Sequence, residues 1–128
     1  MAKAEEAYNE ALAVRRRLAE ANPDAYLPDV ATTLNGLTYL YLSNGQIDEA
    51  KASGSEAEQI LDPLWQENPE VHGNRMARTL WTRARIAEAA KAPASEACAL
   101  ARRALAAAYD SALKESIQQL IDRLCPEV

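Results

Sequence analysis

Apolar residues recur at intervals of three and four along most of the chain, which is the spacing that gives an α-helix one apolar face. The clearest of these faces consists of Val30, Leu34, Leu37, Thr38 and Tyr41. The same periodicity predicts helices over about 4–21, 28–43, 46–67, 70–90 and 94–109. In the last segment, 111–124, apolar residues lie opposite polar ones, which predicts a helix that covers the end of a helical array.

Capping residues set the expected helix boundaries. Asn22 and Asn68 are good N-caps, and each precedes a proline, which is favoured at the first helical position. Pro28 is expected to delay or kink the start of the first of these two helices. The segment 94–124 contains neither glycine nor proline. We expect a break near residue 110, where an aspartate and a serine can both cap a helix, and one continuous helix is the alternative.

The chain repeats itself with a shift of 46 residues, which becomes 47 near its end. The shift carries Asn22-Pro23 onto Asn68-Pro69 and Thr33-Leu34 onto Thr79-Leu80. Each unit is expected to consist of two helices. The predicted single domain therefore comprises a half repeat over 4–22, repeats over 23–68 and 69–109, and a capping helix over 111–124.

Composition narrows the class of protein. Alanine supplies 27 of the 128 residues and phenylalanine is absent, which favours an all-α protein over a strand-rich one. The net charge of −5 argues against a nucleic-acid binder, which needs a basic surface. No stretch has the pattern of a leader peptide or a membrane span. Cys98 and Cys125 lie in no disulfide pattern, so we expect unpaired cysteines and a cytoplasmic location.

The repeat resembles the tetratricopeptide repeat (TPR) family, in which large apolar, small and aromatic residues stand at fixed offsets. The repeat over 23–68 matches this pattern at Leu34, Leu37, Thr38, Tyr41, Gly45, Ala50, Gly54 and Ala57. The repeat over 69–109 departs from it, with Arg83 in place of leucine and Lys91 in place of glycine. The period exceeds the usual one of about 34 residues and is similar to that of kinesin-light-chain-like bacterial repeats. The resemblance implies an α-α superhelix of helical hairpins, and HEAT-type repeats are the alternative.

The first helix of each TPR hairpin lines a concave groove that receives a peptide, so the resemblance implies such a groove here. The positions carried over are Thr32, Asn35, Tyr39 and Leu42 in the first full repeat, and Arg78, Trp81, Arg85 and Glu88 in the second. The resemblance also implies that Asn35 bonds a peptide backbone, a role that suits an amide because it both donates and accepts hydrogen bonds.

Charge predicts what this groove prefers. The helix expected over 70–90 is basic, and Arg78, Trp81 and Arg85 share one face of it at i, i+3 and i+7. Arginine binds carboxylates in a bidentate fork, so we expect an acidic peptide or a terminal carboxylate as the ligand. The alternative is that these arginines pair with neighbouring acids while Trp81 packs between helices.

Catalytic signals are lacking in the sequence. No nucleophile–base pair, phosphate loop or metal-ligand spacing is recognisable, so we expect no catalysis, no cofactor and no metal. The expected function is a scaffold that binds a protein or peptide, with no nucleic-acid or membrane partner. Two alternatives stay open: a homodimer through the open edge of the N-terminal helix, and a sensor segment of a larger signalling protein.

Overall fold

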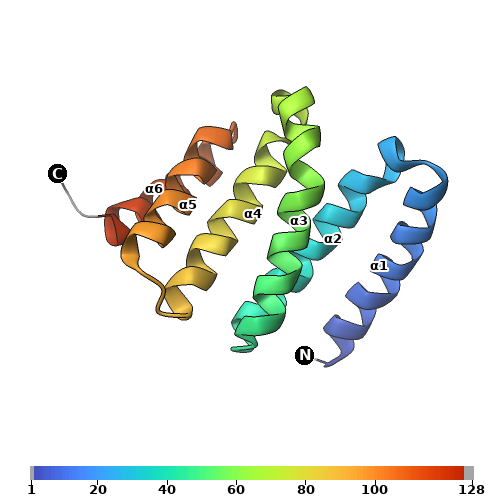
Figure 1. The fold of residues 1–128 in the computed structure, drawn as a ribbon, viewed down its shortest axis with the longest axis horizontal. Helices are drawn as coiled ribbons and strands as arrows, with labels where there is room; N and C mark the ends of the chain where they lie inside the picture. The colour runs from blue at the N-terminus through green and yellow to red at the C-terminus, as the bar shows by residue number, and fades with distance from the viewer. Residues whose placement is uncertain (1, 126–128) are drawn as a thin grey trace.

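The computed structural model describes residues 2–125 and is all-helical over that range. Its helices are α1 (Ala2–Ala21), α2 (Pro23–Ser43), α3 (Ile47–Glu67), α4 (Pro69–Ala89), α5 (Ala94–Ala107) and α6 (Ser111–Leu124). Figure 1 shows them laid side by side in chain order, with α1 at one end of the long axis and α5 and α6 at the other. None of these helices is both long and apolar enough to cross a membrane.

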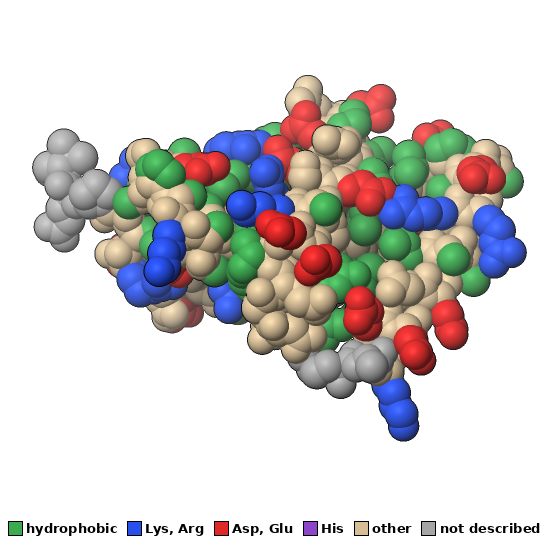
Figure 2. Space-filling view, turned by 60° about the horizontal axis from the view of Figure 1, so that its bottom comes forward, with side chains coloured by type: hydrophobic (Ala, Val, Ile, Leu, Met, Phe, Trp, Pro, Cys, Tyr) green, Lys and Arg blue, Asp and Glu red, His purple; other side chains and the backbone are tan. Residues whose placement is uncertain are grey.

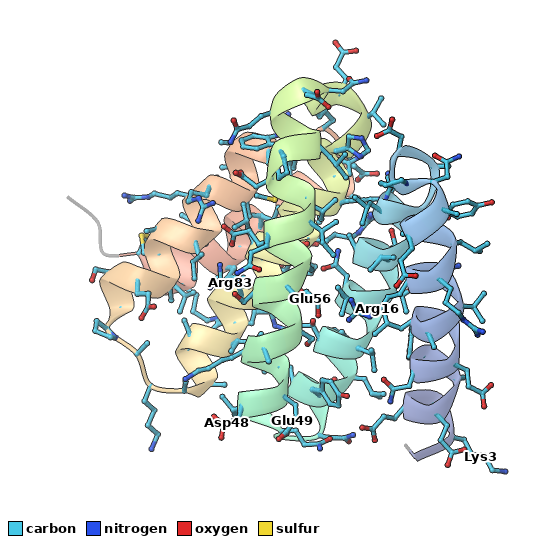
Figure 3. The ribbon with its side chains drawn as sticks, turned by 45° about the vertical axis from the view of Figure 1, so that its right-hand side comes forward. Lys3, Arg16, Asp48, Glu49, Glu56 and Arg83 are labelled. Atoms are coloured by element: carbon cyan, nitrogen blue, oxygen red, sulfur yellow. A yellow bond between two sulfur atoms is a disulfide. The ribbon has the colours of Figure 1, made fainter. Side chains whose placement is uncertain are left out.

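The even-numbered helices form the closer-packed layer. Each helix packs against the next one in the chain, and α2 also contacts α4, which in turn contacts α6. Helix α3 is joined to α1 and α5 by ion pairs, Arg16 with Glu56 and Arg103 with Glu58. Figure 3 shows Arg16 and Arg83 on either side of α3. In Figure 2, acidic side chains stand over α3, with basic side chains to both sides.

The core is built from alanines and a few large apolar side chains. Leu61, Met76, Leu80 and Ile117 are fully buried between α3, α4 and α6. The alanines of the same cluster, which let helices approach closely, are Ala31, Ala77, Ala84, Ala101, Ala104, Ala107 and Ala108. Gly73 allows a close approach to the backbone at the end of α5, because a Cβ there would lie 2.4 Å from the carbonyl oxygen of Ala107. The alanine-rich composition therefore reflects helix-to-helix packing.

Helix α2 begins at Pro23, so the expected delay to residue 28 is wrong. The Asn22 side chain accepts a hydrogen bond from the Ala25 N–H at 3.4 Å, and Pro23 stands at the first helical position. These two residues start the helix, and Pro28 remains inside it. Pro28 removes one bond of the helical ladder, the one to the Asp24 carbonyl, and the helix continues through it.

The predicted break between 94 and 124 is confirmed. Asp110 caps α6 by accepting a hydrogen bond from the Leu113 N–H at 2.9 Å. The Asn74 side chain of α4 accepts from the backbone N–H groups of Tyr109 and Asp110, at 2.8 and 3.0 Å. One amide oxygen of α4 thus holds the connection between α5 and α6 in place.

The expectation of unpaired cysteines is wrong. Cys98 on α5 and Cys125, just after α6, form a disulfide with their Cα atoms 5.1 Å apart. The pairing depends on α6 folding back along α5, which no local spacing signals. The expected cytoplasmic location rested on free thiols, and it loses that support because disulfides persist mainly in oxidising compartments.

Candidate functional site

A cavity of about 340 Å³ lies where α2 and α4 meet, beside α1. It is lined by Tyr8, Thr32, Asn35, Gly36, Tyr39, Arg75, Arg78, Trp81 and Thr82. Helical periodicity explains the set, since the lining residues of α2 and of α4 each recur at intervals of about three to four on one face. The cavity is the candidate site because most of the predicted groove residues line it.

Tyr8 closes the cavity on the side of α1. A Cβ at Gly36 would lie 2.4 Å from the Tyr8 ring, so only glycine lets this ring rest on α2. Tyr8 is 37% exposed. A mid-helix glycine that permits close approach is the one local signal for this contact, and it does not identify the partner ring.

Asn35 joins α2 to α4. Its Oδ1 accepts a hydrogen bond from the Thr79 hydroxyl at 2.7 Å, and its Nδ2 donates to the backbone carbonyl of Arg75 at 3.4 Å. A second link lies beside it, where Arg75 Nε donates to Thr32 Oγ1 at 3.0 Å. Asn35 therefore holds the two helices together. A primary amide retains one further N–H and one further lone pair for a ligand.

Arg85 is held at the edge of the cavity by aromatic rings. Its guanidinium carbon lies 5.8 Å from the centroid of the Tyr39 ring and 5.8 Å from that of Trp81, one ring from each helix. Trp81 also packs against the core, as the alternative interpretation expects, whereas Tyr39 is 56% exposed. Cation–π attraction to the two rings holds the guanidinium between them and leaves its N–H groups free to donate.

The arginines of α4 divide into two groups. Arg83 pairs with Glu58 of α3, which Arg103 also contacts at 3.1 Å. Within residues 2–125, no carboxylate lies within ion-pair distance of Arg75, Arg78 or Arg85. Pairing with neighbouring acids therefore accounts for Arg83 but not for the arginines at the cavity.

The electrostatics of Glu58 follow from these two partners. Burial raises the pKa of the Glu58 carboxyl, and the hydrogen bonds from Arg103 and Arg83 outweigh this effect, so that its pKa lies below the ordinary value. The ion pair lies between α3, α4 and α5, away from the α2–α4 cavity.

The predicted groove residues fall into three groups. Thr32, Asn35, Tyr39, Arg78 and Trp81 line the cavity, and Arg85 stacks on two of them at its edge. Leu42 is half-buried and does not line it. Glu88 instead forms an ion pair with Arg123 of α6.

The sequence reasoning missed four lining residues: Tyr8, Gly36, Arg75 and Thr82. Arg75 and Thr82 could have been predicted, because they stand at i−3 and i+4 from Arg78 and so share its face of the helix. Tyr8 could not have been predicted, because its position depends on how α1 crosses α2.

A second hollow of about 350 Å³ lies between α3, α4 and α5. Its polar lining includes Lys51, Arg83 and Glu96, and Arg83 is already paired there. Over the described part of the chain, no three side chains of the His, Cys, Asp and Glu types gather where they could hold a metal ion.

The described residues form an all-α array in which neighbouring helices run antiparallel, and a cavity lined by arginine and aromatic side chains lies between α2 and α4. No family model, curated protein or solved structure matches this chain.

Proposed function

We propose that this chain is a non-catalytic TPR-like interaction module that binds an acidic or carboxylate-terminated segment of a protein partner in the α2–α4 cavity. In such a module the first helices of the hairpins form the inner, concave layer. The packing of α2 on α4 and of α4 on α6 supports this layout, since helices on the inner side of a curved stack approach each other more closely.

The carrying observation is the set of arginines at the cavity, Arg75, Arg78 and Arg85, with no carboxylate within ion-pair distance in residues 2–125. Positive charges that border one cavity repel each other, and an anionic ligand relieves that repulsion. A carboxylate is the matching group, because the planar guanidinium donates two parallel hydrogen bonds to it.

Aromatic residues supply the non-polar part of the proposed contact. Tyr39 and Trp81 come from different helices and flank Arg85, so a bound segment would cover both rings while its carboxylate meets the guanidinium. Aromatic and arginine side chains carry a large share of the free energy in protein interfaces. Asn35 lines the same cavity, and its remaining N–H can donate to a peptide carbonyl.

The test is a titration monitored by fluorescence anisotropy of a labelled peptide. Three probes are compared: a tetraglutamate peptide with a free C-terminus, the same peptide amidated, and a tetraglutamine peptide amidated at its C-terminus. We expect both glutamate peptides to bind at least about tenfold more tightly than the glutamine peptide, the fold-change that corresponds to 1.4 kcal/mol. A difference between the two glutamate peptides measures the contribution of the terminal carboxylate.

Substitutions at single positions test whether the peptide binds in the α2–α4 cavity. Arg85→Glu is expected to raise the dissociation constant about tenfold or more, whereas Arg102→Glu makes the same change of charge on the exposed side of α5 and serves as its control. Trp81→Ala tests the aromatic contact. Equal binding of all three peptides, or equal weakening by Arg85→Glu and Arg102→Glu, would reject the proposal in favour of non-specific attraction.

A further inference from the structure

Helix α1 carries an uncovered apolar stripe at the end of the array. It consists of Ala7, Ala11, Val14 and Leu18, at spacings of four, three and four residues, which is the seam pattern of packed helix pairs. Val14 is 48% exposed and Leu18 is 40% exposed. The stripe borders a hollow of about 470 Å³, which is also lined by Glu10 and Arg15 of α1 and by Tyr26 and Asp29 of α2.

The internal repeat identifies this stripe as a surface on which a helix packs. The shift of 46 residues carries it onto Ser53, Ala57, Ile60 and Leu64 of α3. There α2 covers the surface: the Thr38 and Ser53 hydroxyls lie 2.7 Å apart, and Ala57 is fully buried in a cluster with Val30 and Leu34. The same register on α1 has no covering helix within the described residues.

The opposite end of the array, formed by α6, has a polar outer surface. Helix α6 turns Leu113, Ile117 and Leu120 inward and buries them. The residues it presents to solvent are polar, among them Lys114, Gln118 and Asp122. One end is therefore polar and the other apolar, so copies cannot stack head to tail on complementary apolar surfaces. A second copy therefore matches the stripe best by presenting its own.

The stripe is self-complementary in an antiparallel arrangement. When two α1 helices cross with Ala11 of one copy level with Val14 of the second, Ala7 of each copy meets Leu18 of the other. Each small side chain then faces a large one, twice over by symmetry, which fills an interface without voids.

Charges beside the stripe fit the same register. Glu10 and Arg17 flank it on the side away from α2 and are exposed, and neither has an ion-pair partner within residues 2–125. They stand seven residues apart, so antiparallel packing sets Glu10 of one copy against Arg17 of the second and repeats the pair by symmetry.

We propose that the chain forms a symmetric homodimer through antiparallel packing of α1 on α1 of a second copy, with Ala7, Ala11, Val14 and Leu18 at the seam and Glu10–Arg17 pairs along its edge. The seam shares no residue with the acidic-peptide cavity, to which α1 contributes Tyr8.

Sedimentation velocity of the full chain across a range of concentrations tests the dimer. We expect the wild-type chain to shift from monomer to dimer as concentration rises. Arg17→Glu and Glu10→Arg each place like charges opposite each other twice, and each is expected to raise the dimer dissociation constant about tenfold or more. The double variant, Glu10→Arg with Arg17→Glu, restores opposite charges and is expected to dimerise like the wild type.

Matched variants keep the result interpretable. Lys114→Glu makes the same kind of charge reversal on α6 and should leave the dimer unchanged, as should Trp81→Ala. Circular dichroism checks that every variant is folded. A wild-type chain that stays monomeric overturns the proposal, as does a double variant no better than the single ones. Binding of a peptide with the sequence of residues 23–43 to a monomeric wild-type chain would assign the stripe to a helix of a different partner and also overturn it.

Discussion

Reduction of the Cys98–Cys125 disulfide should destabilise the whole array. The bond closes a loop with a sequence separation of 27 residues. In the chain-entropy model, closing a loop of this size stabilises the folded state by about 3.5 kcal/mol, through the entropy removed from the unfolded chain. A domain of this size has only about 5–15 kcal/mol of stability in total, so the loss is large.

Urea unfolding of the wild-type chain, with and without reductant, measures this contribution while every side chain stays in place. With a slope of about 1.5–2 kcal/mol/M, the reduced chain should unfold at a urea concentration about 2 M lower. The variant with Cys98→Ala and Cys125→Ala should match the reduced wild-type chain and show no response to reductant. Equal midpoints for the oxidised and reduced chains, or two free thiols in the untreated protein, would refute the reasoning.

Three further substitutions are expected to change the free energy of unfolding, the first upward, the second downward and the third in a way that depends on pH. Lys91 adopts a positive φ of 59°, so Lys91→Gly should raise the free energy of unfolding by about 1 kcal/mol in a urea titration. Gly36→Ala should lower it by about 1–3 kcal/mol through a clash with Tyr8, and the same change in a Tyr8→Ala background should be neutral or stabilising. Because the pKa of Glu58 is lowered, its stabilising effect is complete above the ordinary carboxyl pKa of 4.5 and is lost as the pH falls through the lowered pKa. Glu58→Gln should therefore flatten the dependence of the free energy of unfolding on pH in this acid range. An unchanged pH dependence would contradict the role of the ion pair.

Local signals predicted most of the helices. The N-cap at Asn22, the glycine at position 45 and the cap at Asp110 each act within a few residues of their own position, so the helix ends they mark were recognisable. Pro28 gives a false signal for the start of α2, because the cap at Asn22 and the proline at position 23 start the helix before it. Lys91 stands where the resemblance to TPR repeats expects glycine, and its positive φ of 59° is a conformation that glycine adopts without steric cost.

Contacts between helices set the limit of prediction. The disulfide depends on α6 lying along α5, and the contact of Tyr8 with Gly36 depends on the crossing of α1 and α2. The same limit applies to Asn35, which periodicity placed on the correct face. The periodicity did not reveal that Thr79 and the Arg75 carbonyl occupy part of its hydrogen-bonding capacity.

The arginines of α4 show which part of the candidate site could be predicted from the sequence. Successive residues of a helix turn by about 100°, so Arg83 lies about 140° around the helix from Arg78, whereas Arg75 lies about 60° from it. Arg83 therefore faces the acidic helix α3 and pairs with Glu58, and the others face α2, which presents no carboxylate to them. A count of charges over the helix averages these two faces. Helical register separates Arg83, which pairs within the fold, from the arginines that have no carboxylate partner in residues 2–125. Together with the proposed function, it predicts that Arg83→Gln lowers the free energy of unfolding, whereas Arg85→Gln weakens peptide binding and leaves the free energy of unfolding nearly unchanged.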